Sequence, residues 1–201
     1  MGQMEVIGIR QQIADRLRAD IVAGALAPNQ KVTEEALAQR FGVSRGPIRD
    51  VLLELSKEGL LVTRANRDTR VNDVAAPEVQ TMLVKLRLDI ETYALQRVAQ
   101  NPSGEFLQRL GEALHDLSMQ LRAGNFAEVA KADIAFHRLI VHEAGGDDLV
   151  NLWQPIIMRM RMNYRRLASP DQAIVEHEQI VAAIGAGNGA AAVTALKTNV
   201  R

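Results

Sequence analysis

The sequence predicts a mainly α-helical protein in which an N-terminal winged helix-turn-helix, made of three helices plus a β-hairpin, is joined to an all-α helical bundle. Two observations predict this fold. A helix–turn–helix pattern centred on Gly42 is followed by two short apolar segments around a polar turn at 65–68. From Pro77 onward, the apolar residues recur only with a helical period. We place the boundary after Val74, which gives domains at residues 1–74 and 75–201.

Composition narrows the class of protein. The chain has 201 residues, enough for one large or two small domains, and it has no cysteine for disulfides or thiolate chemistry. No apolar run approaches the roughly 18–20 residues that a membrane span needs, and no signal-like stretch follows Met1. We therefore expect a cytoplasmic protein without a membrane partner. Aromatic residues are only 3% of the chain, which disfavours recognition of single strands by base stacking.

The first three predicted helices have recognisable start and stop residues. The helix over 9–22 carries apolar residues at every fourth position, namely Ile13, Leu17 and Ile21. Thr33 is placed to cap a short second helix, and Gly42 lets the chain turn with a positive φ. Ser44 is placed as the N-cap of the third helix, its hydroxyl accepting from a backbone N–H, and Gly59 closes that helix. These signals predict three short helices in sequence.

Basic residues gather at the start of the third helix and on the hairpin after it. Arg45 and Arg49 are four residues apart, so they share one face near the N-terminus of the helix. A recognition helix in a DNA major groove presents its base-reading side chains at this end. The strands predicted at 60–62 and 69–71 would form the wing. Although the formal net charge is zero, this placement predicts a local basic face and binding to double-stranded DNA.

The chain after the linker at 74–77 contains six predicted helices. Proline, glycine, asparagine and serine mark the breaks between them. The helices are expected near 78–100 and 104–123, then after Asn125 to about Ala144, after Asp147 to about Leu167, from Pro170 to Ala186, and after Gly189 in a helix still in progress at Arg201. Six helices in this length indicate an all-α bundle.

The N-terminal residues resemble a known family. The matching segments are Leu17–Ile21, Gly24–Pro28, Leu37–Ala38, Gly42–Arg45, Pro47–Arg49 and Glu58–Leu60. They resemble the GntR-type bacterial transcription regulators, FadR subfamily, whose helical part is an FCD ligand-binding and dimerisation domain. The resemblance implies that Ser44, Arg45 and Arg49 contact operator DNA and that Asn66 and Arg67 at the wing tip reach the minor groove.

The alternatives for these surface residues are structural. Arg49 could instead clamp a phosphate or form a salt bridge with Asp50 or Glu54. Arginine and asparagine are also common at the tip of any hairpin, so Asn66 and Arg67 could be ordinary surface residues.

A second group of residues lies in the helical part. Asp133 and His137 are four residues apart on one helix face, and His177 follows forty residues later. Carboxylate and imidazole suit Zn²⁺, Ni²⁺ or Mn²⁺, although such a pair is also a common surface ion pair. The resemblance implies a metal site, because metal-binding FCD domains carry Asp-x-x-x-His, a later His and a final His. Here Asn199 stands at the final position, which leaves three possibilities: an altered site, a weak site, or no metal.

The resemblance also implies a cavity that receives a small organic-acid effector. Arg87 stands where FCD relatives carry an arginine facing the cavity, and it could bind an effector carboxylate with two hydrogen bonds. Its alternative role is an interhelical salt bridge. We expect Arg87 and Asn199 to contact the effector, and a retained metal (Zn²⁺ or Ni²⁺) to bridge it. If no metal binds, the pocket would hold the effector directly.

These observations predict a ligand-responsive transcription regulator that binds a pseudo-palindromic operator as a homodimer and acts as a repressor. A second hypothesis is a metal-dependent enzyme, but Glu176 and Glu178 flank His177 and would point away from the metal, so the sequence offers no evident general base. A third is a protein-interaction module, which Arg45 and Arg49 disfavour. We therefore predict no enzymatic activity. No motif in the sequence identifies the effector or the operator.

Overall fold

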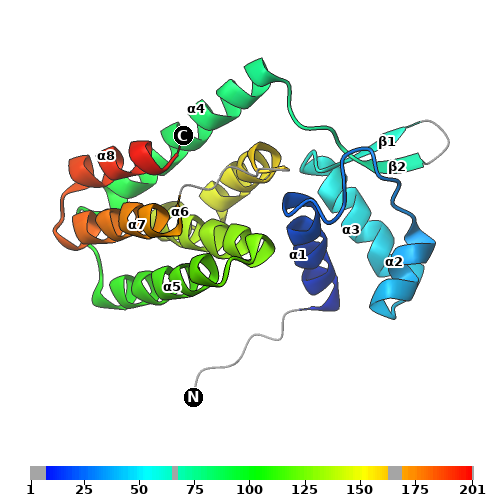
Figure 1. Cartoon of the computed structure of the whole chain (residues 1–201), viewed down its shortest axis with the longest axis horizontal. Coiled ribbons are helices and arrows are strands. Elements are labelled where there is room, and N and C mark those ends of the chain that lie inside the picture. Colours follow the sequence, from blue (N-terminus) through cyan, green and yellow to red (C-terminus); the bar gives the residue numbers. More distant parts are fainter. Residues whose placement is uncertain (1–7, 65–67, 163–168, 201) are drawn as a thin grey trace. The chain divides into compact units, whose positions relative to one another are not determined.

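The protein is described by a computed structural model that covers residues 8–64, 68–162 and 169–200 (Figure 1). It divides into two compact units: the chain up to Val74 together with residues 161–162, and Ala75–Met160 together with the helices after residue 169. Each unit has its own core. None of the helices in these ranges combines the length and the apolar character needed to cross a bilayer.

The first unit is a winged helix-turn-helix, as predicted. It contains α1 (Ile9–Val22), α2 (Glu34–Phe41), α3 (Arg45–Lys57), β1 (Leu61–Arg64) and β2 (Asp68–Val71). The two strands are antiparallel, with Leu61 opposite Val71. The segment before α2 adds to this sheet through an antiparallel bridge between Lys31 and Arg70, which no sequence pattern predicted. Three backbone hydrogen bonds of 2.9 Å hold it, from Val32 N to Thr69 O, from Val71 N to Gln30 O and from Asn29 N to Val71 O.

An ion cluster is buried where α1 packs on α3. The Arg18 side chain is almost fully buried and donates to Glu58 through Nε and Nη2, at 2.9 and 2.6 Å. It also donates to Asp15 at 2.7 Å and to Glu54. Around this cluster lies an apolar core that includes Ile13, Leu17, Ile21, Ile48, Val51 and Leu55. Glu54 pairs with Arg18, so the salt bridge between Glu54 and Arg49 that the sequence left open does not form.

Most of the predicted turn and cap residues are confirmed. Thr33 accepts from Ala36 N at 3.2 Å, Gly42 has a φ of 65°, and Gly59 has a φ of 73°. The prediction for Ser44 was wrong in one respect. It occupies the N-cap position with extended backbone angles, but its hydroxyl makes no capping hydrogen bond. The Ser44 side chain is exposed, so its hydroxyl faces solvent.

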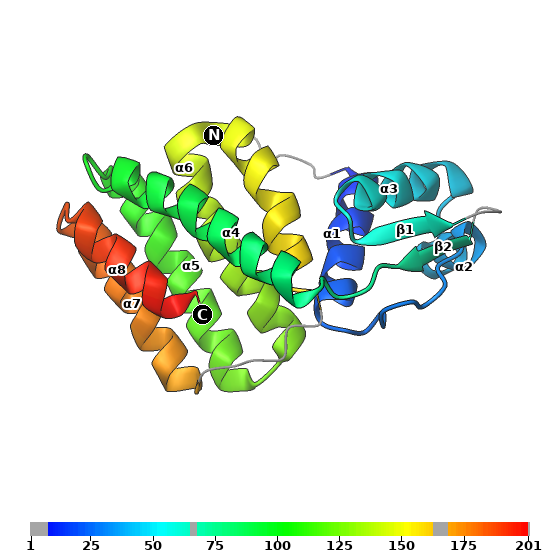
Figure 2. The ribbon, with the colours of Figure 1, turned by 90° about the horizontal axis from the view of Figure 1, so that it is seen from above.

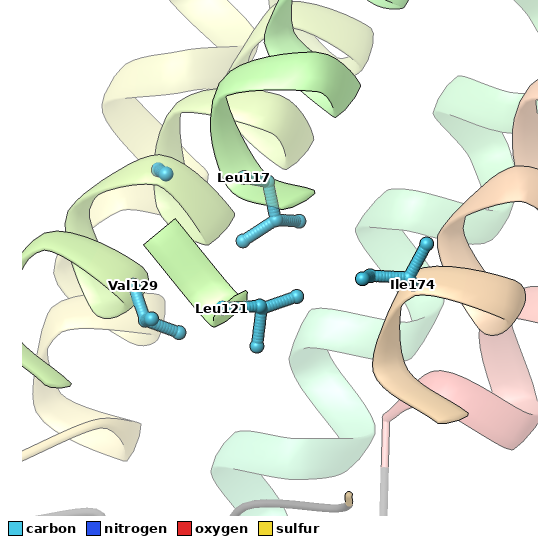
Figure 3. Packing of buried hydrophobic residues seen from close by; sticks show 5 residues of the cluster. Leu117, Leu121, Val129 and Ile174 are labelled. Carbon is cyan, nitrogen blue, oxygen red and sulfur yellow. The ribbon is translucent and has the colours of Figure 1, made fainter. Parts of the chain in front are cut away.

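The second unit is an all-α bundle of α4 (Pro77–Val98), α5 (Gly104–Ala123), α6 (Phe126–Met160), α7 (Pro170–Gly185) and α8 (Gly189–Asn199). Helix α6 packs on α4 and α5, while α7 packs on α5 and α8 (Figure 2). One apolar cluster joins α5, α6 and α7 through Leu117, Leu121, Val129, Ala132 and Ile174 (Figure 3). Helix α5 packs on both α6 and α7, so this cluster connects the two helices that carry Asp133, His137 and His177.

Helix α6 is interrupted at the glycines where the sequence predicts a break. Gly146 has φ and ψ of 60° and −156°, a conformation that strongly favours glycine. At Gly145, a Cβ would lie 2.8 Å from Leu149 Cβ. The two segments of α6 therefore correspond to two of the six predicted helices.

Two predicted helix ends were wrong. The second segment of α6 ends at Met160 instead of continuing to about Leu167; residues 161–162 form a turn, and 163–168 lie outside the described residues. Methionine and arginine alternate over residues 158–162, and this period of two does not extend the apolar stripe of a helix. The last helix ends at Asn199, because Val200 leaves the helical conformation with φ and ψ of −92° and 86° and its side chain is buried.

Candidate functional site

The candidate DNA-reading side chains lie on the surface at the start of α3. The side chains of Arg45 and Arg49 are 61% and 67% exposed, and Ser44 beside them is exposed as well. They remain accessible because the side of α3 that faces the core is formed by other residues, Ile48, Val51 and Leu55, which are fully buried. The arrangement presents two cations on one accessible helix end, as a groove-binding helix requires.

Both arginines lie beside acidic residues of the first turn of α2. Arg49 donates to both carboxylate oxygens of Glu34, from Nε at 3.0 Å and from Nη2 at 2.9 Å. Arg45 Nη2 lies 3.5 Å from Glu35 Oε1. The hydrogen bonds that Arg49 donates to Glu34, and the charge of Glu34, raise the pKa of Arg49 above its ordinary value. The salt-bridge alternative thus exists in the structure, but with Glu34 as partner instead of Asp50 or Glu54.

Among the residues that the structure describes, the wing supplies fewer candidate DNA contacts than the sequence suggested. Arg70 donates to Asp68 at 2.7 Å and to the carbonyl oxygen of Asn29 at 2.9 Å, so it stabilises the sheet. Asn66 and Arg67, the predicted minor-groove residues, lie outside the described residues.

The predicted metal-binding residues are brought together in the second unit. Asp133 and His137 come from the first segment of α6, and His177 comes from α7. All three are buried, and one potential ligand atom from each lies within 4.8 Å of the others. His177 Nε2 is 3.4 Å from Asp133 Oδ1. Two ligand atoms of one tetrahedral zinc ion would lie roughly 3.4 Å apart, so the spacing of this pair suits a shared ion.

The hydrogen bonds of the two histidines leave one nitrogen of each available. His177 Nδ1 lies 2.7 Å from the carbonyl oxygen of Ala173, which requires a proton on Nδ1. His137 Nδ1 lies 2.9 Å from Glu91 Oε2, which favours the same tautomer. The Nε2 atoms of both rings are buried without a hydrogen-bond partner. Two imidazole lone pairs beside a carboxylate form the donor set of a 2-His-1-carboxylate metal site, so these residues fit a divalent metal.

The electrostatics also suit a ligand histidine. Burial lowers the pKa of His137, with Arg87 acting in the same direction and Glu91 opposing them. His137 is therefore neutral near pH 7, which is the form that coordinates metals. The ring packs edge-on against Phe136 at 5.4 Å between centroids, and the His177 ring packs on Phe136 at 5.0 Å.

Asn199, at the end of α8, lies beside this group of residues. Its Nδ2 is 3.4 Å from His177 Nδ1, and its Oδ1 is buried without a hydrogen-bond partner. An amide oxygen that lacks a partner can serve a ligand or an ion. The position of Asn199 is therefore compatible with the altered metal site anticipated from the sequence.

Arg87 is fully buried, but its observed partner differs from the expected one. Its Nε donates to Glu91 Oε1 at 2.7 Å, within α4, so the salt bridge is intrahelical and not interhelical. The Arg87 Nη2 atom is buried without a hydrogen-bond partner. The space beside Glu91 and His137 does not admit a water molecule in this conformation. An effector that enters beside His137 would need this space to open.

Sequence reasoning missed Glu91, which is 2% exposed. The Glu91 carboxylate contacts Arg87 and His137, and it also accepts a hydrogen bond from Trp153 Nε1 at 2.8 Å. Although burial opposes its ionisation, the charge of Arg87 above all, together with the side-chain contacts of Arg87 and His137, lowers the pKa of Glu91 to about 2. The only signal in the sequence was the spacing of four residues between Arg87 and Glu91, which does not reveal the partners on α6.

Comparison with known proteins places both units in described families. Residues 9–71 match the family of bacterial regulatory proteins called the gntR family, and residues 82–201 match the FCD domain. The chain is 26% identical over 185 residues to the HTH-type transcriptional repressor RspR of Escherichia coli strain K12, covering 90% of this chain and 81% of that protein. It is 25% identical over 186 residues to the gluconate operon transcriptional repressor of Bacillus licheniformis, covering 88% and 75%.

Solved structures show the same fold. McbR/YncC of E. coli superposes with a TM-score of 0.84 at 20% identity, covering 97% of this chain and 94% of that chain. A GntR regulator from Rhodococcus sp. RHA1 superposes with a TM-score of 0.76 at 25% identity, covering 95% and 93%. The chain therefore belongs to the GntR family of bacterial transcription regulators, with an FCD domain after its winged helix-turn-helix, and not to a class of enzymes.

Proposed function

We propose that this protein is a ligand-responsive repressor that binds a pseudo-palindromic operator as a homodimer in the cytoplasm. Residues 1–74 form the DNA-binding domain, and residues 75–201 form the effector-binding and dimerisation domain. The observation that carries the proposal is the exposed pair Arg45 and Arg49 at the N-terminal turn of α3. Each arginine can donate two hydrogen bonds to guanine O6 and N7, with Ser44 and the wing residues Asn66 and Arg67 contacting the backbone or minor groove.

Dimerisation follows from the symmetry of such operators. Two recognition helices spaced by about one DNA turn, roughly 34 Å, read two half-sites. An apolar face on α4 supports self-association, because large apolar side chains that are half or more exposed recur along it: Val79, Met82 and Tyr93, with Leu86 at 39% between them. An unpartnered apolar stripe on a helix is a common site of subunit contact. We assign this face to contact between the two copies.

The effector site is centred on Asp133, His137 and His177. These three side chains would hold a divalent ion, Zn²⁺ or Ni²⁺, with the Asn199 amide oxygen or a water completing the set. When bound, the ion supplies a Lewis-acid centre for the carboxylate of a small organic acid. The buried Arg87 Nη2 atom offers a further donor to the same carboxylate.

Effector binding must change operator affinity through the linker. Helix α4 carries Arg87 and Glu91 and begins at Pro77, three residues after Val74. A displacement of α4 when the closed space opens would alter the placement of the DNA-binding domains in the dimer. Couplings of this kind amount to about 1–3 kcal/mol.

Selection of operator sequences tests the proposal directly. The wild-type protein is used to select duplexes from a random double-stranded library, and binding of the selected duplex is measured by fluorescence anisotropy. The double variant R45A/R49A should lose at least about thirty-fold in affinity, because two base contacts of roughly 1–3 kcal/mol each disappear. The control R138A removes an exposed arginine of α6 and should bind normally. If the selection enriches no sequence, or if R45A/R49A binds the selected duplex normally, the assignment is refuted.

A further inference from the structure

A buried carboxylate connects three helical segments in the middle of the second unit. Glu91 lies on α4, His137 lies on the first segment of α6, and Trp153 lies on the second segment, beyond the break at Gly145 and Gly146. The side chains of these three residues are 2% exposed or less. Glu91 Oε1 accepts from Trp153 Nε1 at 2.8 Å, and Oε2 lies 2.9 Å from His137 Nδ1. The two oxygens therefore serve different segments of α6.

The Glu91 carboxylate does more than neutralise the charge of Arg87. Arg87 Nε uses Glu91 Oε1 alone, at 2.7 Å, so neutralising Arg87 does not require Oε2 to face His137. A charged group in an apolar interior is expensive unless its hydrogen bonds are made, and here the neighbouring core residues are Ala94 and Leu95. Oε2 makes no hydrogen bond to any other group in the described part of the chain, and its contact with His137 Nδ1 at 2.9 Å points to a role in orienting the imidazole.

We propose that Glu91 is a positioning residue for the candidate metal centre. It keeps the proton of His137 on Nδ1 and directs the lone pair of Nε2 toward Asp133 and His177. The Trp153 indole fixes the carboxylate in turn. The inference rests on the proposed metal site. Carboxylates that accept from a ligand histidine fix both its tautomer and its orientation, and losing one typically weakens metal binding 10–100-fold.

The two histidines of the site are oriented by different kinds of acceptor. His177 Nδ1 is held by the backbone carbonyl of Ala173, which no side-chain substitution removes. His137 depends on a side chain. Replacing Glu91 should therefore change the tautomer of His137 and leave that of His177 unchanged, which separates a specific orienting role from a general loss of packing.

The test combines Zn²⁺ titration calorimetry with nitrogen-15 NMR of the histidine rings in the metal-free protein. In E91Q the new amide can donate to His137 Nδ1, which favours the tautomer protonated on Nε2 and removes the lone pair that a metal needs. We expect Zn²⁺ affinity to fall about 10–100-fold, with a changed His137 tautomer. The control E143Q alters an α6 carboxylate that pairs with Arg109 at 2.9 Å, outside this group, and should bind Zn²⁺ normally.

Two further variants guard against a failure of E91Q to fold. W153F removes the indole donor while keeping every charge, and E91D keeps the charge for Arg87 but shortens the side chain. Both should weaken Zn²⁺ binding, W153F less than E91D. Wild-type Zn²⁺ affinity and an unchanged His137 tautomer in the folded Glu91 variants would overturn the inference alone. Absence of Zn²⁺ binding by the wild type would instead overturn the proposed metal site, and the inference with it.

Discussion

Arg49 and Glu34 form an ion pair with two hydrogen bonds across the helix-turn-helix turn, from Nε at 3.0 Å and from Nη2 at 2.9 Å. A guanidinium has five N–H donors, so this pair leaves both Nη1 donors and one Nη2 donor free of Glu34. These remaining donors are suitably spaced for guanine O6 and N7. Glu34 can therefore orient Arg49 while Arg49 contacts DNA.

Removing Glu34 should show whether this residue affects DNA binding by orienting Arg49 or only through its negative charge. In E34A the loss of a negative charge near the DNA should increase binding to non-specific duplex. The ratio of operator affinity to non-specific affinity should fall several-fold, because Arg49 loses its fixed orientation. Both affinities are measured by anisotropy at two salt concentrations. The control is E35A, whose partner Arg45 lies at 3.5 Å and is held more loosely. An equal rise of both affinities would mean that Glu34 acts only through its charge.

Metal binding should depend on His137 and respond to Asn199. Zn²⁺ or Ni²⁺ titration calorimetry of the wild type should show one site per chain, and H137A should abolish it. The variant N199H should bind at least about ten-fold more tightly, because imidazole is a better ligand than an amide for these ions. H142A, which removes an exposed histidine of α6, is the matched control. Binding that appears only in N199H would show that the natural Asn199 has abolished the site and that the effector is bound without metal.

The buried cluster around Arg18 should dominate the stability of the DNA-binding domain. Replacing Arg18 by methionine (R18M) would leave the carboxylates of Glu54 and Glu58 close together without the cation that they share. Loss of one partner of a fully buried ion pair costs about 3–5 kcal/mol. Because Glu58 and Glu54 are 13% and 35% exposed, the cost of R18M should be smaller, about 2–3 kcal/mol, and urea unfolding followed by circular dichroism should show the first unit unfolding earlier. The control R16A removes an exposed arginine, and the buried Asp20 keeps its pair with Arg40 at 2.6 Å, so the expected cost is about 0–1 kcal/mol. Equal stabilities of R18M and R16A would contradict the role assigned to the cluster.

Self-association should depend on the apolar face of α4. A charge placed on this face, as in L86E, should shift the protein toward monomer in sedimentation velocity, because an unpaired carboxylate would be buried at the contact. The control L152E places the same charge at a leucine of α6 that is 66% exposed. Operator binding should weaken together with dimerisation in L86E. A dimer that withstands L86E would locate the contact elsewhere.

Local signals in the sequence were sufficient for most of the fold. The positive φ of Gly42 and the cap at Thr33 depend on one or two neighbouring residues, and both were predicted from residue type alone. The pairing of Asp133 with His137 on one helix face also follows from spacing. The unexpected sheet bridge between Lys31 and Arg70 joins residues far apart in the chain, so no local pattern predicts it.

The sequence by itself determined the fold class, the family and the residue types available for DNA and metal binding, because these are expressed in local periodicity and short motifs. Only the tertiary structure decided the partners of those residues. Glu91 contacts His137 and Trp153 because α4 packs on α6, and Glu34 contacts Arg49 because α2 packs on α3. A helix specifies which side chains share a face, whereas the packing of two helices specifies which side chains meet, and this depends on the whole core.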